Sequence, residues 1–282
     1  MSQAPAKTYV ITGANTGIGK ITARELARTG AHVILACRSP AKTQPVIDEL
    51  KRESGNGRIE LVELDLADLA SVRKCAHELL ARGTPIHGLV NNAGLAGHRG
   101  TTKDGFEIQF GTNHLGHYLF TRLLLPRLEE SAPARIVHVA SDSHYGAKRI
   151  DWEAVRRRTR SRTGYPEYEV SKLANVLFSS ELARRLESDK VTTYAVHPGA
   201  VATDVWRRVP APARWLLKKF LLTPEQGATS SVRCATAPEL ATTTGRYYGK
   251  DGQEKRPSKL SQDAALAAEL WEKSAEWTGL GA

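Results

Sequence analysis

The sequence predicts an α/β fold built on a doubly wound parallel sheet with helices on both faces. From residue 8 to residue 196, short β-branched and apolar segments alternate with segments of helical periodicity. The apolar segments read as continuous runs, which is typical of strands buried on both faces. Such alternation indicates βαβ units, and right-handed crossovers between them give a doubly wound sheet.

The elements are expected in the following order. Strands are predicted at residues 8–12, 32–37, 59–64, 86–90, 135–140 and 191–196. Helices are predicted between them at 18–29, 40–54 with Ser39 as N-cap, 69–82, 112–130 and 165–186. A helix starting at Thr223-Pro-Glu-Gln226, a short strand at 245–248 and a helix at 263–277 follow.

No repeat or flexible linker interrupts this order, so residues 1–282 are expected to form a single domain. The stretch 204–222 is amphipathic and contains prolines, and we expect it to cover the substrate as a mobile lid. Two alternatives are an ordinary surface helix and an interfacial membrane contact.

Composition narrows the class of protein. The chain carries 40 Lys and Arg residues against 30 Asp and Glu, a net charge of +10. The densest basic run, 156–162, is either a solvated loop or a patch for lipid headgroups or an acidic partner. We find no nucleic-acid motif, no apolar leader and no apolar run of about 18 residues. Three cysteines without metal-ligand spacing favour a cytoplasmic protein with no metal site.

A glycine-rich turn follows the first strand. Gly13-Ala-Asn-Thr-Gly-Ile-Gly19 lies where the first helix begins. Glycines permit a tight turn and close approach of the backbone to a phosphate. The helix N-terminus adds hydrogen-bond donors and positive potential. The turn therefore indicates a pyrophosphate site on a Rossmann-type fold.

A second signal is Tyr168 followed four residues later by Lys172 on a predicted helix. Residues at this spacing share one helix face. A neighbouring ammonium favours the phenolate and moves the pKa of a tyrosine from about 10 toward neutral pH. The pair could therefore act as a tuned proton donor. Alone the pattern is weak, because Tyr and Lys are common on helices.

Taken in order, the motifs resemble those of short-chain dehydrogenases/reductases. The glycine turn is followed by Asn91-Asn-Ala-Gly94 and by Asn113 with Gly116. Ser141 at the end of the fifth strand, Tyr168 with Lys172, and Pro198-Gly199 with Val201 and Thr203 complete the set. The similarity extends over the whole chain.

Within that family the chain looks most like the retinol-dehydrogenase-like branch. The segments that carry this likeness are Thr12-Gly-Ala-Asn-Thr-Gly-Ile-Gly-Lys20, Leu35-Ala-Cys-Arg38, Leu64-Asp-Leu-Ala67, Thr112-Asn-His-Leu-Gly-His117 and Thr223-Pro-Glu-Gln-Gly227. The wide separation of Ser141 and Tyr168 indicates an inserted loop at 145–164. Two features depart from that branch: no apolar N-terminal anchor is present, and the substrate region is rich in Arg.

The resemblance implies a cofactor site. Its residues would be Gly13, Asn15, Thr16, Gly17, Ile18, Gly19, Arg38, Asp65, Leu66, Asn91, Ala93, Gly94, Tyr168, Lys172, Pro198, Gly199, Val201 and Thr203. Arg38 ends the second strand, where an acidic residue would repel a 2′-phosphate, so its charged fork favours NADP(H). The alternative is that Arg38 points to solvent. Asp65 would lie near the adenine, cap a helix, or do both.

The resemblance also implies a reaction, the interconversion of a carbonyl and an alcohol on a lipophilic substrate. Tyr168 would donate or accept the proton, and Lys172 would lower its pKa and bind the nicotinamide ribose. Ser141 would hydrogen-bond the substrate oxygen, and Asn113 would hold a water that links Lys172 to solvent. The substrate would contact Ser141, Ser143, Tyr145, Tyr168 and Trp206. His114, His117, His138 and His144 are expected in core or surface roles.

Two other functions remain open. The chain could be a carbon–carbon double-bond reductase resembling protochlorophyllide reductase, which shares the His114-Leu-Gly-His117 stretch. It could also be a non-catalytic dinucleotide sensor, because fold does not fix function. As partners we expect a small lipophilic substrate, peripheral membrane contact and pairing into a homodimer through helices 112–130 and 166–186.

Overall fold

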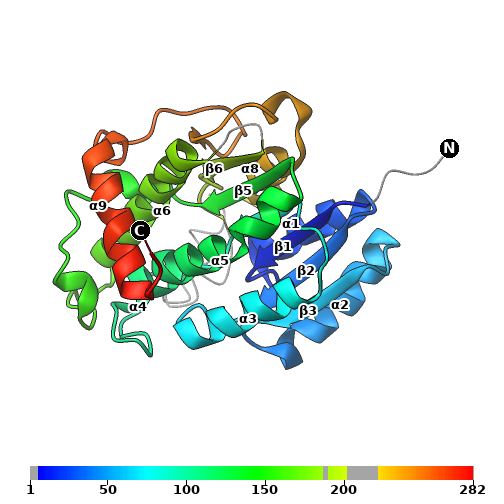
Figure 1. The fold of residues 1–282 in the computed structure, drawn as a ribbon, viewed down its shortest axis with the longest axis horizontal. Coiled ribbons are helices and arrows are strands. Elements are labelled where there is room, and N and C mark those ends of the chain that lie inside the picture. Colours follow the sequence, from blue (N-terminus) through cyan, green and yellow to red (C-terminus); the bar gives the residue numbers. More distant parts are fainter. Residues whose placement is uncertain (1–5, 187–189, 202–221, 282) are drawn as a thin grey trace.

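A seven-stranded, all-parallel sheet forms the centre of the protein. The computed structural model describes residues 6–186, 190–201 and 222–281. Its strands are β1 (Thr8–Thr12), β2 (His32–Cys37), β3 (Ile59–Glu63), β4 (Gly88–Asn91), β5 (Ala134–Val139), β6 (Val191–Val196) and β7 (Arg246–Tyr248). Their order across the sheet is β3-β2-β1-β4-β5-β6-β7, as the doubly wound prediction requires (Figure 1). The predicted lid lies outside the described residues except for Leu222, as do Thr203 and Trp206.

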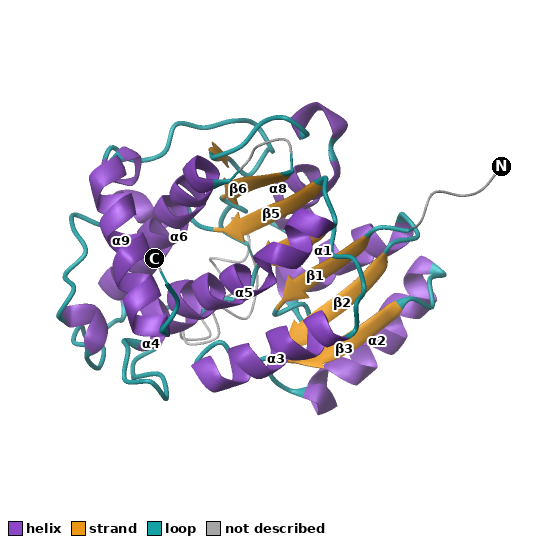
Figure 2. Ribbon diagram, viewed as in Figure 1, coloured by secondary structure: helices purple, strands orange, loops and turns teal. Residues whose placement is uncertain are grey.

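Helices cover both faces of the sheet (Figure 2). The α-helices are α1 (Gly17–Arg28), α2 (Pro40–Ser54), α3 (Leu69–Ala81), α4 (Ile108–Phe110), α5 (Gly116–Glu130), α6 (Tyr165–Arg185), α8 (Pro224–Thr236) and α9 (Ala264–Thr278). Shorter turns are η1 (Gly111–Leu115), η2 (Asp142–Gly146), η3 (Ala154–Arg156), η5 (Pro238–Leu240) and η6 (Leu260–Gln262).

Alternation along the strands divides the core into two layers. In β1, Tyr9 and Ile11 pack under α1, α2 and α8, whereas Val10 faces the cluster formed with α3, α5, α6 and α9. This is the period of two expected for a strand buried on both faces. All the strands run in one direction, so their carboxyl ends meet at one edge of the sheet.

The helix predicted at 112–130 starts earlier and differently. It begins with α4, where the Glu107 carboxylate accepts bonds from the amides of Gln109 (2.9 Å) and Phe110 (2.8 Å). It then passes through the π-helical turn η1 before α5. Such turns arise from one extra residue per turn, which hydrophobic periodicity does not reveal. The Ser39 prediction is right in position, but its side chain forms no capping bond.

The C-terminal helix α9 lies over α5 and α6 (Figure 1). Trp271 is 4% exposed and packs edge-on against Tyr118 with ring centres 5.3 Å apart. The guanidinium groups of Arg122 and Arg185 lie 4.5 Å from its ring centre. α9 therefore occupies part of the α5–α6 face, through which pairing into a homodimer stays a prediction. Of the described helices, none is both long and apolar enough to cross a bilayer.

Candidate active site

Lys172 lies against the carboxyl end of β5. It is 4% exposed, and its Nζ donates a bond of 2.7 Å to the Val139 carbonyl. The same atom lies 5.7 Å from the centre of the Tyr168 ring. Burial lowers the pKa of Lys172 to about 8. Helix α6 therefore presents both residues on one face, as their spacing predicts.

Tyr168 is half-buried beside Ser141. Burial raises the pKa of its hydroxyl to about 12, and the hydrogen bond with the Ser141 hydroxyl opposes this rise. In the protein alone, the pKa of Tyr168 thus lies above its ordinary value and not below it as the sequence predicts, because desolvation of the phenolate outweighs the interactions that favour it. The tyrosine is held in its protonated form at neutral pH.

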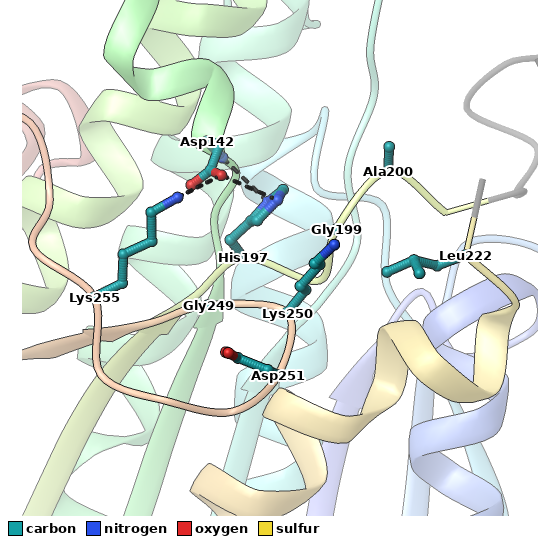
Figure 3. Close-up of a pocket in the computed structure, with 9 residues that line it drawn as sticks. All are labelled: Asp142, His197, Gly199, Ala200, Leu222, Gly249, Lys250, Asp251 and Lys255. Carbon is teal, nitrogen blue, oxygen red and sulfur yellow. Dashed lines mark hydrogen bonds and ion pairs between the residues drawn. The ribbon is translucent and has the colours of Figure 1, made fainter. Parts of the chain in front are cut away.

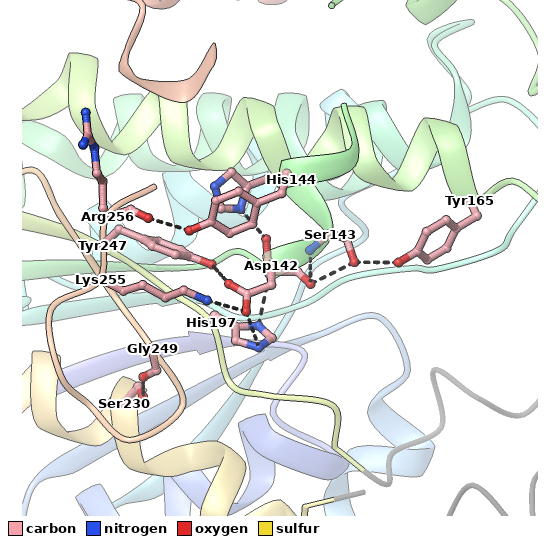
Figure 4. Close-up of polar contacts among 12 residues, drawn as sticks. Asp142, Ser143, His144, Tyr165, His197, Ser230, Tyr247, Gly249, Lys255 and Arg256 are labelled. Atoms are coloured by element: carbon pink, nitrogen blue, oxygen red, sulfur yellow. Dashed lines mark hydrogen bonds and ion pairs between the residues drawn. The ribbon is translucent and has the colours of Figure 1, made fainter. Parts of the chain in front are cut away.

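Ser141 belongs to a chain of hydroxyl groups. Its Oγ donates to Ser143 Oγ at 3.1 Å and accepts the Ser143 amide at 3.1 Å. Ser143 Oγ lies 3.0 Å from the hydroxyl of Tyr165, whose side chain is 47% exposed (Figure 4). Ser143, predicted to contact substrate, thus lies next to the Ser141 hydroxyl. Tyr145 donates its hydroxyl to the Arg256 carbonyl and is already bonded within the protein.

Asn113 connects the π-turn to the loop after β4. Its Oδ1 accepts the Leu95 amide at 2.8 Å, and its Nδ2 donates to the Leu95 carbonyl and to Ser171 Oγ, both at 2.9 Å. Ser171 Oγ in turn donates to the Tyr168 carbonyl at 2.8 Å. A methyl group at Gly94 would lie 3.5 Å from both Asn113 Oδ1 and Lys172 Nζ. The four predicted catalytic residues and Gly94 therefore share one site.

The glycine turn has the shape that a pyrophosphate needs. Gly13 and Gly17 adopt φ of 64° and 55°, a region that favours glycine. A Cβ at Gly19 would lie 2.4 Å from Asn92 Nδ2 and 2.8 Å from the Gly13 carbonyl oxygen. The first turn of α1 holds no acidic residue. The glycines are thus required by the tight packing of the turn itself, and the amides of the helix N-terminus together with the lack of acidic residues fit a dinucleotide phosphate.

Thr12 and His117 hold this turn against the loop after β4, a role that the sequence reasoning missed. The Thr12 hydroxyl oxygen accepts the amides of Asn92 (2.9 Å) and Ala93 (3.0 Å), so its proton is free to bond His117 Nε2 at 2.8 Å. His117 Nδ1 then donates to the Asn113 carbonyl at 2.9 Å. Burial lowers the pKa of His117 to about 4. The neutral ring thus links the glycine turn to Asn113.

Several predicted cofactor residues can be placed more closely. The Asn91 side chain faces the core, where its Nδ2 bonds Thr121 Oγ1 (2.8 Å) and His138 Nδ1 (3.2 Å), and Asn92 instead reaches the glycine turn. Asp65 is not the N-cap of α3. That position belongs to Asp68, whereas Asp65 Oδ1 accepts the Ala67 amide at 3.0 Å.

Arg38, Ile18 and Val201 were also predicted to contact the cofactor. Arg38 is exposed at the end of β2 and forms no ion pair within the described part of the chain. On the other side, a Cβ at Gly227 would lie 2.6 Å from Val201 Cγ2 and 3.1 Å from Ile18 Cγ1. Gly227 therefore lets α8 approach both predicted residues.

The histidines named from the sequence are core residues. His114, His117 and His138 are 2% exposed or less, and burial lowers the pKa of His114 and of His138 to about 3. His114 Nε2 lies 2.9 Å from Ser274 Oγ in α9. Among the residues described, no group of three His, Cys, Asp or Glu side chains could hold a metal ion.

Comparison with known proteins identifies the family to which the chain belongs. Residues 7–155 match the family model described as short chain dehydrogenase. Human retinol dehydrogenase 13 is 42% identical over 291 residues, covering 99% of this chain and 86% of that protein. Human retinol dehydrogenase 11 is 43% identical over 281 residues, covering 99% and 87%.

Solved structures agree in fold. The 3-ketoacyl-(acyl-carrier-protein) reductase from Brucella melitensis, complexed with NADH, aligns with a TM-score of 0.67 and 25% identity over 87% of this chain and 97% of that one. A variant of actinorhodin polyketide ketoreductase with NADPH aligns with a TM-score of 0.69 and 23% identity over 90% and 100%. The chain belongs to the short-chain dehydrogenase/reductase family and is an oxidoreductase related to the retinol dehydrogenases.

Proposed function

We propose that the protein interconverts a carbonyl and an alcohol on a lipophilic substrate, with NADP(H) as cofactor and Tyr168 as the proton donor or acceptor. The observation that carries this proposal is the convergence of Ser141, Tyr168 and Lys172 at the carboxyl end of β5. Relatives named retinol dehydrogenases support an alcohol or aldehyde of low polarity as substrate.

Each residue of the site has a separate role in the proposed reaction. The nicotinamide cofactor, when bound, supplies or accepts a hydride. Ser141 positions the substrate oxygen by a hydrogen bond, and Tyr168 Oη holds the proton that this oxygen receives on reduction. The raised pKa of Tyr168 keeps that proton in place at neutral pH. Lys172 places a cation beside the phenol, which stabilises the phenolate that forms when the proton leaves.

NADP(H) is favoured over NAD(H) by charge at the end of β2. Arg38 is exposed there, and the neighbours Cys37 and Ser39 carry no negative charge. A guanidinium can bind a phosphate through two parallel bonds, whereas an acidic residue would repel it. Arg38→Asp should therefore weaken NADPH binding by at least tenfold and leave NADH binding unchanged or improved. Equal use of both cofactors by the wild type would contradict the assignment.

The experiment that tests the function follows NADPH oxidation with a panel of lipophilic aldehydes and ketones, retinal included, with NADH in parallel. We expect turnover with NADPH that Tyr168→Phe abolishes while NADPH still binds. Turnover in Tyr168→Phe would contradict the mechanism. NADPH binding without turnover on any carbonyl would favour the dinucleotide sensor, and reduction restricted to conjugated double bonds would favour the double-bond reductase.

We also propose that the protein works in the cytoplasm and touches anionic membranes through residues 156–162. The three cysteines are free and buried, as suits a reducing compartment. Thr159 is buried and bonds Glu107, and the amides of Arg160 and Ser161 donate to Glu167 Oε1 at 3.1 and 2.9 Å. This loop is therefore held in place while its five arginines (156, 157, 158, 160 and 162) are exposed. A fixed cationic surface beside α6 suits a bilayer that supplies a lipophilic substrate.

A further inference from the structure

Ser141 lies at the start of a short turn that packs against α6. It follows β5 and precedes the 3₁₀ turn η2. Its carbonyl accepts bonds from the His144 amide (3.1 Å) and from His144 Nδ1 (2.7 Å). His144 Nε2 accepts the Ser258 amide at 3.0 Å. The turn is thus closed on itself by His144 and tied to the loop at residues 256–258 by two bonds, the one from the Ser258 amide and the one from the Tyr145 hydroxyl to the Arg256 carbonyl.

Asp142, the next residue, ties the turn to three other parts of the fold (Figure 4). Its Oδ1 accepts the Tyr247 hydroxyl at 2.9 Å, from β7. Its Oδ2 accepts Lys255 Nζ at 2.7 Å, from the loop after β7. Its own amide donates to His197 Nδ1 at 3.1 Å, just after β6. One residue therefore joins the ends of β5, β6 and β7.

The protonation of His197 follows from this geometry. Because Nδ1 accepts the Asp142 amide, the neutral ring carries its proton on Nε2. That atom lies 3.3 Å from Asp142 Oδ2. Burial lowers the pKa of His197, which favours the neutral ring. His197 and Asp142 are therefore joined by two contacts, one from the Asp142 amide to Nδ1 and one between Nε2 and the Asp142 carboxylate.

Hydrogen bonds rather than packing hold Asp142 on its outer side. Asp142, His197 and Lys255 line a cavity of about 340 Å³ (Figure 3). The Asp142–Lys255 pair alone is partly exposed and would contribute little. Tyr247, however, is 2% exposed, so its hydroxyl would be left without this acceptor if the carboxylate were removed. With space beside it, the turn could then shift.

We propose that Asp142 is a positioning residue that sets the place of the Ser141 hydroxyl relative to Tyr168. The segment from Val139 to Asp142 is fixed on its inner side, where Lys172 bonds the Val139 carbonyl, and on its outer side by the Asp142 contacts. Ser141 lies between these two attachments. A displacement of about 1 Å at a reacting centre can cost about 100-fold in rate. Loss of the carboxylate therefore acts on catalysis through Ser141.

The inference rests on the proposed function, and the test separates the two. Steady-state reduction is measured with NADPH and retinal, or with the panel aldehyde that the wild type reduces fastest. We expect Asp142→Ala to lower kcat by about 10- to 100-fold, and Asp142→Asn by less because its amide oxygen can still accept the Tyr247 hydroxyl. KM and the Kd for NADPH should stay within about twofold of the wild-type values. Asp251→Asn is the matched control, since Asp251 lines the same cavity and its Oδ1 bonds only the Gln253 amide among the described contacts.

A double-mutant cycle decides whether Asp142 acts through Ser141. In a Ser141→Ala background, the further effect of Asp142→Asn should nearly vanish. The proposal would be overturned by any of three results. These are an undiminished effect of Asp142→Asn on kcat in the Ser141→Ala background, an unchanged kcat in Asp142→Asn alone, or an equal loss of kcat in Asp251→Asn. If Asp142→Ala fails to fold, as judged by circular dichroism, Asp142→Asn carries the test. No turnover by the wild type would instead count against the proposed function.

Discussion

Replacing Lys172 with Met should remove activity and at the same time stabilise the protein. The lysine is 4% exposed, and burial lowers its pKa from 10.5 to about 8. At 1.36 kcal/mol per pKa unit, keeping this ammonium in the folded protein at neutral pH costs about 3 kcal/mol. Methionine has a similar length and carries no charge, so the substitution removes this cost.

The lost hydrogen bond reduces the gain. The Val139 carbonyl would lose its bond of 2.7 Å from Lys172 Nζ, which costs about 1–2 kcal/mol for a buried acceptor. Asn175 Nδ2, at 3.5 Å from the same oxygen, can partly replace it. The net effect is a rise of about 1–2 kcal/mol in the free energy of unfolding, or roughly 2–6 °C in Tm.

The pH dependence provides the sharper assay. The folded pKa lies below the unfolded value, so wild-type stability should rise between pH 8 and pH 10.5 as the lysine loses its proton in the folded state first. Urea unfolding of wild type and Lys172→Met should show an advantage of the variant at pH 7 that disappears and reverses near pH 10.5, where the neutral lysine no longer carries the desolvation cost but still bonds Val139. Lys259→Met, at an exposed position, is the control. A variant less stable than wild type at pH 7, or an advantage independent of pH, would refute the reasoning.

Three further predictions concern stability and surface contact. The free energy of unfolding should fall as the pH is lowered from 6.5 to 4, because the unfolded chain protonates His117 while burial keeps its folded pKa near 4. In His117→Gln the slope of the free energy of unfolding against pH should be smaller by about 1.4 kcal/mol per pH unit. Parallel profiles of wild type and variant, measured by urea unfolding, would contradict this. Gly116→Ala should destabilise by about 1–3 kcal/mol, because its Cβ would lie 2.5 Å from the Leu66 carbonyl oxygen, whereas Gly57→Ala, with nothing within 4 Å, should be neutral in the same melts. Affinity for phosphatidylserine vesicles, measured by cosedimentation, should fall about 100-fold in the triple variant Arg156→Gln/Arg158→Gln/Arg162→Gln. It should stay unchanged in the control Arg28→Gln/Arg52→Gln/Arg246→Gln, which removes the same charge elsewhere. Equal losses in both variants would show that net charge, and not this loop, causes binding.

The parts that sequence predicted well are those with local patterns. Strand positions followed from apolar runs, and parallel strands bring their carboxyl ends to one edge, so Ser141 and the glycine turn were expected at the same edge of the sheet. The spacing of Tyr168 and Lys172 placed both on one face of α6. The direction of the Asn91 side chain could also have been predicted from the sequence. Alternation along β4 puts it on the same face as Leu89, toward α5, and leaves Asn92 for the glycine turn.

Other features depend on contacts that no local pattern encodes. The partners of Asp142 come from positions 197, 247 and 255, and only the completed sheet brings them together. The raised pKa of Tyr168 reflects the desolvation that surrounding residues impose, whereas the motif shows only the neighbouring cation. The π-helical turn at Asn113 likewise depends on how α4 and α5 are fixed at their ends.

The packing of α9 has a consequence for synthesis of the chain. The helix follows every strand in sequence, yet it covers the α5–α6 face, and Ser274 contacts His114 in the turn that holds Asn113. While the ribosome is still adding these residues, the finished sheet has an uncovered apolar side around Tyr118 and Phe178. A nascent chain stalled before residue 264 would therefore expose an apolar surface beside its predicted catalytic residues. Its release from chaperones should coincide with the arrival of Trp271.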